Sequence, residues 1–152
     1  MTLKAAMWVH GTIVQAETPT SSASVRTGGG TEFTAGGPSL PPVLWFHIPI
    51  PTPVILDGVR PELGKVLVLY KTTLATTVKS IHIYDGPTKV WALDSLDLRG
   101  DHSAELDESN TWIIEPSIPI RFGLGISVGV TFSFDTPSSI LFTSAGADFL
   151  TS

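Results

Sequence analysis

Hydrophobic and polar residues alternate along most of this chain with the two-residue period of a β-strand. The clearest run covers residues 118–134, where the even positions are apolar and the odd positions are mostly polar or glycine. Successive side chains of a strand point to opposite faces, so this run predicts one face in the core and one outside it. As a single straight strand it would span about 55 Å, and we therefore expect a bend or break among its glycines.

Eight segments have the character of strands, and Gly, Pro, Ser and Asp clusters separate them. They are 5–17, 43–50, 65–74, 77–85, 89–98, 111–115, 118–134 and 139–145. No segment keeps the apolar spacing of a helix. The pattern predicts one all-β domain over residues 1–152, an antiparallel β-sandwich, jelly-roll-like, of about eight strands.

Two stretches interrupt the alternation. Residues 27–42, TGGGTEFTAGGPSLPP, are predicted to form a long Gly/Pro-rich loop, and they lack the lysine of a phosphate-binding loop. Pro49, Pro51 and Pro53 remove three backbone donors at alternate positions. They predict an edge strand or a crossing at the rim of the sandwich.

Composition narrows the choice of partners. The net charge is −5 and the nine cations are scattered, so we expect no nucleic-acid partner. No apolar run is long enough for a membrane helix, and the N-terminal apolar stretch is too short for a signal peptide, so we expect no membrane partner and a cytoplasmic location by default, with non-classical release left open. Only 15% of residues are charged and 42% are hydrophobic. This low charge density favours a homo-oligomer.

The stretch GLGISVG, residues 123–129, contains the G-x-S-x-G pattern that surrounds the nucleophile of one class of serine hydrolases. That pattern needs a strand to end at the serine and a helix to begin, whereas here the strand alternation continues. We therefore expect no catalytic residue. The small residues of the second face, Gly123, Gly125, Ser127 and Gly129, are predicted to lie at an interface between subunits, or alternatively under the 27–42 loop.

Candidate binding residues gather around an acidic segment, LDSLDLRGDHSAELDESNTW. Its carboxylates and the tryptophans that flank it are typical of lectin-like sites, with or without calcium. The candidates are Trp91, Asp94, Asp97, Asp101, His102 and Trp112. The four histidines show no metal-ligand spacing, so we expect no metal and no cofactor. In SIHIYDG, His82 shares a strand face with Ser80 and Tyr84, which predicts a polar sheet face, with a Ser-His-Asp group as the alternative.

The succession MWVHG, FHIPIPTPVILDGVRP, IHIYDG, GLGISVGV and SAGADF resembles a family of small, uncharacterised bacterial all-β proteins, a domain of unknown function. The resemblance extends over nearly the whole chain. It implies a sandwich fold and supplies no activity or catalytic residue.

Three function classes follow from the sequence. The first is a non-catalytic β-sandwich that acts by self-association or within a larger assembly. The second is a carbohydrate-binding module centred on the acidic segment. The third, the least favoured, is a serine hydrolase that uses Ser127 or Ser80.

Overall fold

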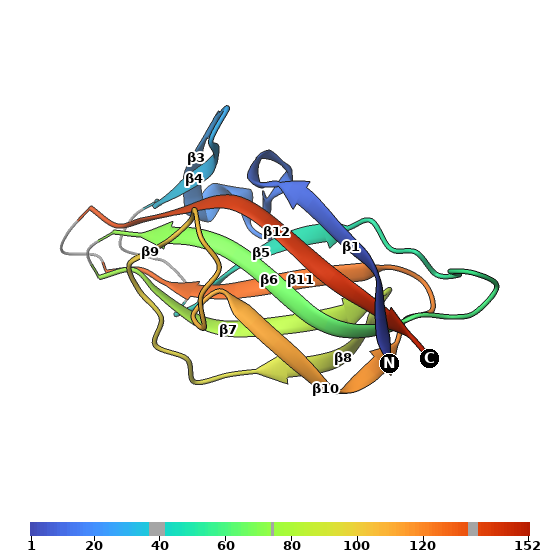
Figure 1. Cartoon of the computed structure of the whole chain (residues 1–152). Coiled ribbons are helices and arrows are strands. Elements are labelled where there is room, and N and C mark those ends of the chain that lie inside the picture. Colours follow the sequence, from blue (N-terminus) through green and yellow to red (C-terminus); the bar gives the residue numbers. More distant parts are fainter. Residues whose placement is uncertain (37–41, 74, 134–136) are drawn as a thin grey trace.

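The computed structural model describes residues 1–36, 42–73, 75–133 and 137–152, and these form an all-β molecule (Figure 1). The strands are β1 (Thr2–His10), β2 (Gln15–Ala16), β3 (Ser22–Thr27), β4 (Gly30–Ala35), β5 (Leu44–Ile50), β6 (Glu62–Thr72), β7 (Thr77–Asp85), β8 (Thr88–Leu93), β9 (Asp101–His102), β10 (Thr111–Pro119), β11 (Leu124–Thr131) and β12 (Ser139–Thr151). Two short 3-10 turns, η1 (Gly11–Ile13) and η2 (Pro19–Ser21), follow β1 and β2.

The strands form two antiparallel sheets. The larger sheet has the order β10-β6-β12-β4-β3, with β1 also paired to β12 and β9 to β6. The smaller sheet has the order β2-β5-β11-β7-β8. In Figure 1 the two sheets lie one behind the other, with β12 and β6 in one and β11 and β7 in the other.

Strands far apart in the sequence are neighbours in both sheets. The eight principal strands, in chain order, are β1, β5, β6, β7, β8, β10, β11 and β12. In the larger sheet these strands lie in the order β1-β12-β6-β10, which are the first, eighth, third and sixth of the eight. In the smaller sheet they lie in the order β5-β11-β7-β8, which are the second, seventh, fourth and fifth. The two antiparallel sheets form the β-sandwich that the sequence predicts.

The core lies between the sheets and contains the apolar face of each alternating strand. In β5, Leu44, Phe46, Ile48 and Ile50 point inward, and in β11 the inward residues Leu124, Ile126, Val128 and Val130 are all at most 3% exposed. Three phenylalanine rings, Phe33, Phe46 and Phe142, pack together with ring centroids 4.6 to 6.0 Å apart. The outward residues of β5 and β11 are therefore the ones left for function.

The alternation in residues 118–134 correctly predicts which side chains of the described strands face the core, except at Phe122. The run is broken: β10 ends at Pro119 and β11 begins at Leu124. In the turn between them the Asp85 carboxylate accepts hydrogen bonds from the backbone N–H groups of residues 121, 122 and 123. Phe122 is 75% exposed, although the alternation places it in the core, because this turn takes it out of the strand.

The 27–42 loop prediction is wrong for most of its described residues. Gly30–Ala35 form β4, which pairs with β3 along its whole length and with the start of β12. A tight turn with Gly30 at a φ of 132° joins β3 to β4. The sequence analysis missed this hairpin because its strands are rich in Ser, Thr and Glu and show no alternation of apolar and polar residues. Residues 37–41 lie outside the described residues.

Pro49 has the surroundings expected of a proline in a strand. It lies in β5, which pairs with β11 on one side, whereas β2 covers the other side only at Phe46 and His47. The Pro49 position therefore has a free edge and needs no backbone donor there.

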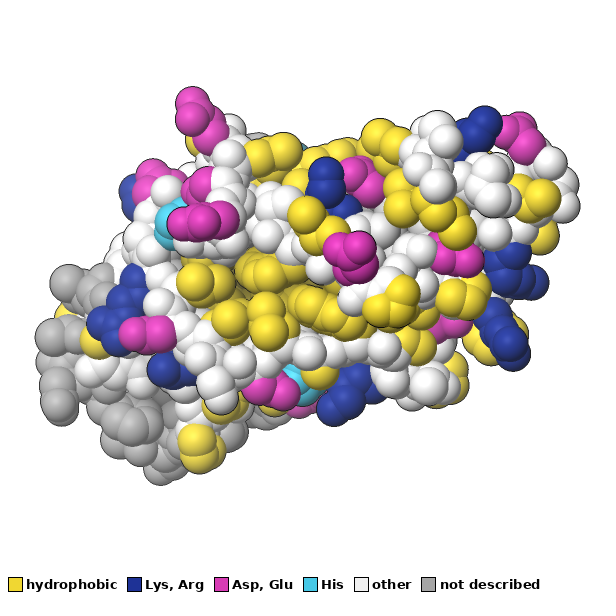
Figure 2. Space-filling model, turned by 60° about the horizontal axis from the view of Figure 1, so that its bottom comes forward, with side chains coloured by type: hydrophobic (Ala, Val, Ile, Leu, Met, Phe, Trp, Pro, Cys, Tyr) yellow, Lys and Arg dark blue, Asp and Glu magenta, His cyan; other side chains and the backbone are white. Residues whose placement is uncertain are grey.

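Figure 2 shows the side of the molecule on which the edge strands β8 and β10 lie. Hydrophobic side chains gather in a depression across its middle, with charged side chains around them. Val90, Trp91 and Leu93 of β8 and Leu96 and Leu98 after it are partly buried and pack against the core. The sandwich is thus less completely closed at this edge than in its centre.

Candidate functional site

The outer face of the five-stranded sheet brings three polar side chains into one row. Ser127 of β11 lies opposite His47 of β5 on one side and opposite His82 of β7 on the other. Directly opposite residues of antiparallel strands have Cβ atoms about 5 Å apart, so their side chains interact. His47 and Ser127 are 80 positions apart in the sequence, and they meet only through the pairing of the sheet.

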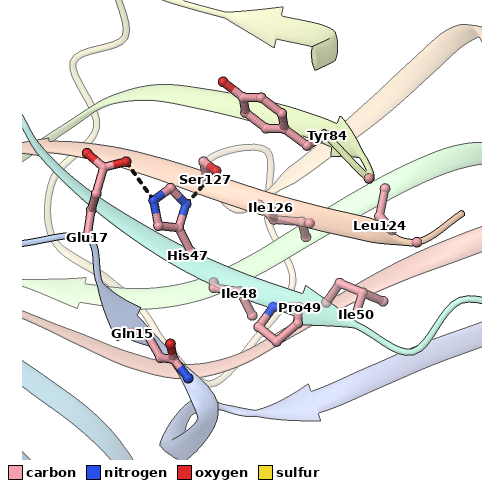
Figure 3. Close-up of a pocket in the computed structure, with 13 residues that line it drawn as sticks. Gln15, Glu17, His47, Ile48, Pro49, Ile50, Tyr84, Leu124, Ile126 and Ser127 are labelled. Carbon is pink, nitrogen blue, oxygen red and sulfur yellow. Dashed lines mark hydrogen bonds and ion pairs between the residues drawn. The ribbon is translucent and has the colours of Figure 1, made fainter. Parts of the chain in front are cut away.

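A chain of hydrogen bonds joins Glu17, His47 and Ser127 (Figure 3). The Nε2 atom of His47 lies 3.0 Å from Oε1 of Glu17, and its Nδ1 lies 2.7 Å from Oγ of Ser127. The ionised carboxylate only accepts hydrogen bonds, so Nε2 is the donor, and in the neutral ring Nδ1 accepts from the Ser127 hydroxyl. The imidazole is thereby held in one orientation.

Local structure places each member of this chain. The short strand β2 pairs with β5 at Gln15 and Ala16, and the Glu17 N–H then donates to the Trp45 carbonyl at 2.9 Å. Glu17 is thus brought beside His47, two residues along β5 from Trp45. The side chains of His47 and Glu17 are 43% and 55% exposed, so the pair faces solvent, whereas Ser127 is only 5% exposed.

A second histidine–carboxylate pair lies across β11 from the first. His82 Nε2 donates to Oδ1 of Asp94 at 2.8 Å. Hydrogen bonds from Ser80 and from His82 hold the pKa of Asp94 below its usual value. The predicted polar face of β7 is therefore present, and Ser80 and His82 share Asp94, not Asp85, as their carboxylate partner.

Trp45 reaches across β11 to His82, and their ring centroids are 4.6 Å apart. The crossing point is Gly129, which lies opposite Trp45 in β5 and Ser80 in β7. A Cβ atom built on Gly129 would lie 3.1 Å from Cη2 of Trp45. The absence of a side chain at 129 thus lets the indole lie over the strand.

A hollow of about 720 Å³ opens beside the Glu17–His47–Ser127 chain. Its floor includes the backbone of Gly123 and Gly125, and a Cβ atom built on Gly125 would meet no atom within 4 Å. Tyr84 stands on one side, and Gln15 and Pro49 on the other (Figure 3). The volume is within the range of small-molecule sites.

A smaller hollow of about 240 Å³ adjoins it. Both are lined by Glu17, His47, Tyr84 and Ser127, and the smaller one adds Trp45, His82 and Lys89. The two hollows therefore form one trough across β5, β11 and β7.

The residues predicted from the acidic segment do not come together on this face. Of the six, Asp94 alone lies there, through His82. Trp112 is 8% exposed in the core, and Trp91 of β8 packs against the core. Asp97 pairs with Lys79 and Arg99, Asp101 with Lys71, and His102 with Asp107. In the part of the chain that is described, no three His, Asp or Glu side chains are placed to hold a metal ion.

The predicted small-residue face is present, with a different shape from the one expected. Gly123, Gly125, Ser127 and Gly129 do face outward from the sheet, but Gly125 opens a hollow and Gly129 is covered by Trp45. Residues 27–36 belong to β3, β4 and the adjoining chain, and do not cover this face. The homo-oligomer stays a prediction.

Sequence reasoning missed Glu17, Trp45, His47 and Tyr84 as members of one site. The alternation in VLWFHIPI already places Trp45, His47 and Pro49 on one face. What the sequence lacks is the pairing of β5 with β11, which joins residues 80 positions apart.

These features define a two-sheet β-sandwich protein with a candidate ligand site on its five-stranded sheet. The chain belongs to a family of unknown function (DUF6623), whose model matches residues 2–142. This confirms the resemblance to a domain of unknown function seen in the sequence. No curated protein and no solved structure matches the chain. Among the described residues, no helix has the length and apolar character needed to cross a membrane.

Proposed function

We propose that this protein is a non-catalytic binding protein and that its ligand is a carbohydrate held in the hollow over Gly125. The observation behind this proposal is the hollow itself, which joins a bare glycine floor, one aromatic side chain and a fixed row of hydrogen-bonding groups. The proposal keeps the carbohydrate class suggested by the sequence and moves the site from the acidic segment to the outer face of β11.

The chemistry of the lining matches that of a sugar ring. A sugar has an apolar C–H face and a rim of hydroxyl groups that both donate and accept hydrogen bonds. Tyr84 offers an aromatic surface for the former, and Glu17, Gln15 and Ser127 offer acceptors and donors for the latter. Since Glu17 fixes the orientation of His47, these polar groups are positioned before the ligand arrives, which lowers the entropy cost of binding.

A hydrolytic role for Ser127 has less support, although a serine, a histidine and a carboxylate are hydrogen-bonded in series. Ser127 lies in the middle of β11, with β5 and β7 paired on both sides. The backbone N–H groups of a central strand are used in its ladders. They are not free to stabilise the oxyanion of an acyl-transfer reaction, which is the largest contribution in such enzymes.

Chemical-shift mapping tests the proposed site. The ¹⁵N-labelled protein is titrated with glucose, galactose and N-acetylglucosamine, together with their disaccharides maltose, lactose and chitobiose. We expect at least one sugar to shift the amide signals of Gly123, Gly125 and Tyr84. Shifts confined to residues 94–110 would favour the acidic segment instead, and no shift with any of the six sugars would contradict the proposal.

A further inference from the structure

We infer that the ligand of this face has at least two linked rings, and that Trp45 and His82 form a second subsite beside the hollow over Gly125. The inference rests on the proposed function and specifies it: an oligosaccharide chain, in place of a single sugar. It is based on the continuity of the two hollows and on the position of the second aromatic side chain.

The two hollows share a border and extend in different directions from it. Glu17, His47, Tyr84 and Ser127 line both. From this border the larger hollow extends toward Gly123, Gly125 and Gly86, and the smaller one toward Trp45, His82 and Lys89. A ligand in the first hollow thus lies beside a second one with which it shares four lining residues.

Spacing along β11 sets a minimum length for a ligand that fills both hollows. Tyr84 is opposite Gly125, and Trp45 is opposite Gly129. These rows are four residues apart, or about 13 Å at the rise of a β-strand. Tyr84 lines both hollows, whereas Gly125 lines only the larger one and Trp45 only the smaller one. One sugar ring is shorter than the separation of the Gly125 and Gly129 rows, so a ligand that lies over Gly125 and also contacts the indole of Trp45 needs a second ring.

The second subsite has its own recognition groups. The indole of Trp45 packs on the His82 ring, which Asp94 holds through Nε2. With Nε2 donating to Asp94, the neutral His82 ring keeps Nδ1 as an acceptor. Lys89 is exposed and adds a cationic donor to this hollow. An aromatic surface with an acceptor and a donor repeats the kind of lining found in the first hollow.

Calorimetric titration of matched pairs tests the inference. Each sugar that binds in the mapping experiment is compared with its disaccharide, for the wild type and for Trp45→Ala. We expect the wild type to bind the disaccharide about tenfold more tightly than the single sugar. Trp45→Ala should remove most of that difference and leave the affinity for the single sugar within about twofold.

Two controls keep the outcomes separate. Trp45→Phe keeps an aromatic side chain and should keep most of the higher affinity for the disaccharide. A general loss of structure would remove that higher affinity in both variants. Gly125→Val fills the first hollow and should weaken both ligands. Equal affinity of single sugar and disaccharide, or an equal loss of both in Trp45→Ala, would overturn the second subsite while leaving the proposed function intact. No binding of any sugar would contradict both.

Discussion

Two regions of this molecule contain a histidine bonded to a carboxylate, and they differ in what surrounds the pair. On the outer face of β11, His47 is bonded to Glu17 and faces an open hollow. In the acidic segment, His102 lies between Asp107 at 2.8 Å and the Arg99 carbonyl at 2.7 Å. Both ring nitrogens of His102 are therefore occupied by acceptors within its own loop.

The acidic segment is held together by its own polar groups. Asn110 is fully buried, and its side-chain nitrogen donates to the carbonyls of His102 and Glu105. Its oxygen accepts from the Asp107 N–H, and the Tyr70 hydroxyl donates to the Ser109 carbonyl. A cluster of acids and a histidine thus serves to fold a loop, whereas the less conspicuous residues on the sheet leave space for a ligand.

The largest effect is expected from Asn110→Ala. This change removes the partner of three partly buried backbone groups, the carbonyls of His102 and Glu105 and the N–H of Asp107, and we expect a loss of about 2 to 3 kcal/mol in the free energy of unfolding. Ser109→Ala, in the same loop, removes no bond to Asn110 and serves as the control. Urea denaturation measures both variants. A loss below about 0.5 kcal/mol for Asn110→Ala would show that the loop does not depend on this network.

Ser127→Ala should have a smaller effect on stability. It removes one hydrogen bond, to His47, at a position that is 5% exposed, so we expect a loss of about 1 kcal/mol. The freed His47 ring is no longer oriented from that side, and sugar affinity should fall. Urea denaturation and calorimetry measure the two effects. Unchanged affinity would remove Ser127 from the site.

Reaction with a fluorophosphonate probe separates binding from catalysis at the same residue. We expect no covalent adduct at Ser127 in the folded protein, because the amides of β11 lie in the sheet ladders and are not free to form an oxyanion site. Intact-mass spectrometry reads the result, with Ser127→Ala as the control. An adduct that is present in the wild type and absent in this variant would make the protein a serine hydrolase.

The stability of the acidic segment is expected to depend on pH through His102. Burial alone lowers the pKa of His102, but the bonds to Asp107 and to the Arg99 carbonyl and the nearby carboxylates raise it above 6.5 overall. A raised folded-state pKa means that the stabilisation is complete below pH 6.5 and is lost as the pH rises through the folded pKa. We expect His102→Gln to lack this part of the pH dependence.

Urea denaturation between pH 5.5 and pH 9 checks this for the wild type and for His102→Gln. The difference between their free energies of unfolding should shrink as the pH rises. Ionisation of Asp107, whose pKa the His102 bond lowers, falls below this range and does not disturb the comparison. A difference that is constant with pH would show that His102 is not charged in the folded loop.

The sequence predicts the faces of the strands better than their partners. The alternation in residues 118–134 correctly placed Ile126 and Val128 in the core and Ser127 outside it, because side-chain direction in a strand depends only on neighbouring residues. The hairpin of β3 and β4 was missed because β3 is almost wholly exposed and β4 has a single buried hydrophobic residue, Phe33, so neither strand has an apolar pattern. The site was missed for another reason: it depends on the register between β5, β11 and β7, which arises from tertiary packing.

The acidic segment illustrates a second limit of the sequence. Its carboxylates and tryptophans stand out in the sequence, but a list of residue types does not reveal which groups the loop itself will use. Trp112 fills the core, and Asp101 and Asp107 bond within the loop. The sequence alone therefore does not separate the polar groups that fold this loop from groups that are open to a ligand.

The most direct test of the proposed site is Gly125→Val, studied beside Gly28→Val. At both positions a Cβ atom meets no atom within 4 Å, but only residue 125 forms the floor of the hollow. We expect both variants to melt within about 3 °C of the wild type. Calorimetry with the tightest sugar of the panel should show binding by Gly28→Val as in the wild type and a loss of at least about tenfold in Gly125→Val. A folded Gly125→Val that binds the sugar with unchanged affinity would contradict the account.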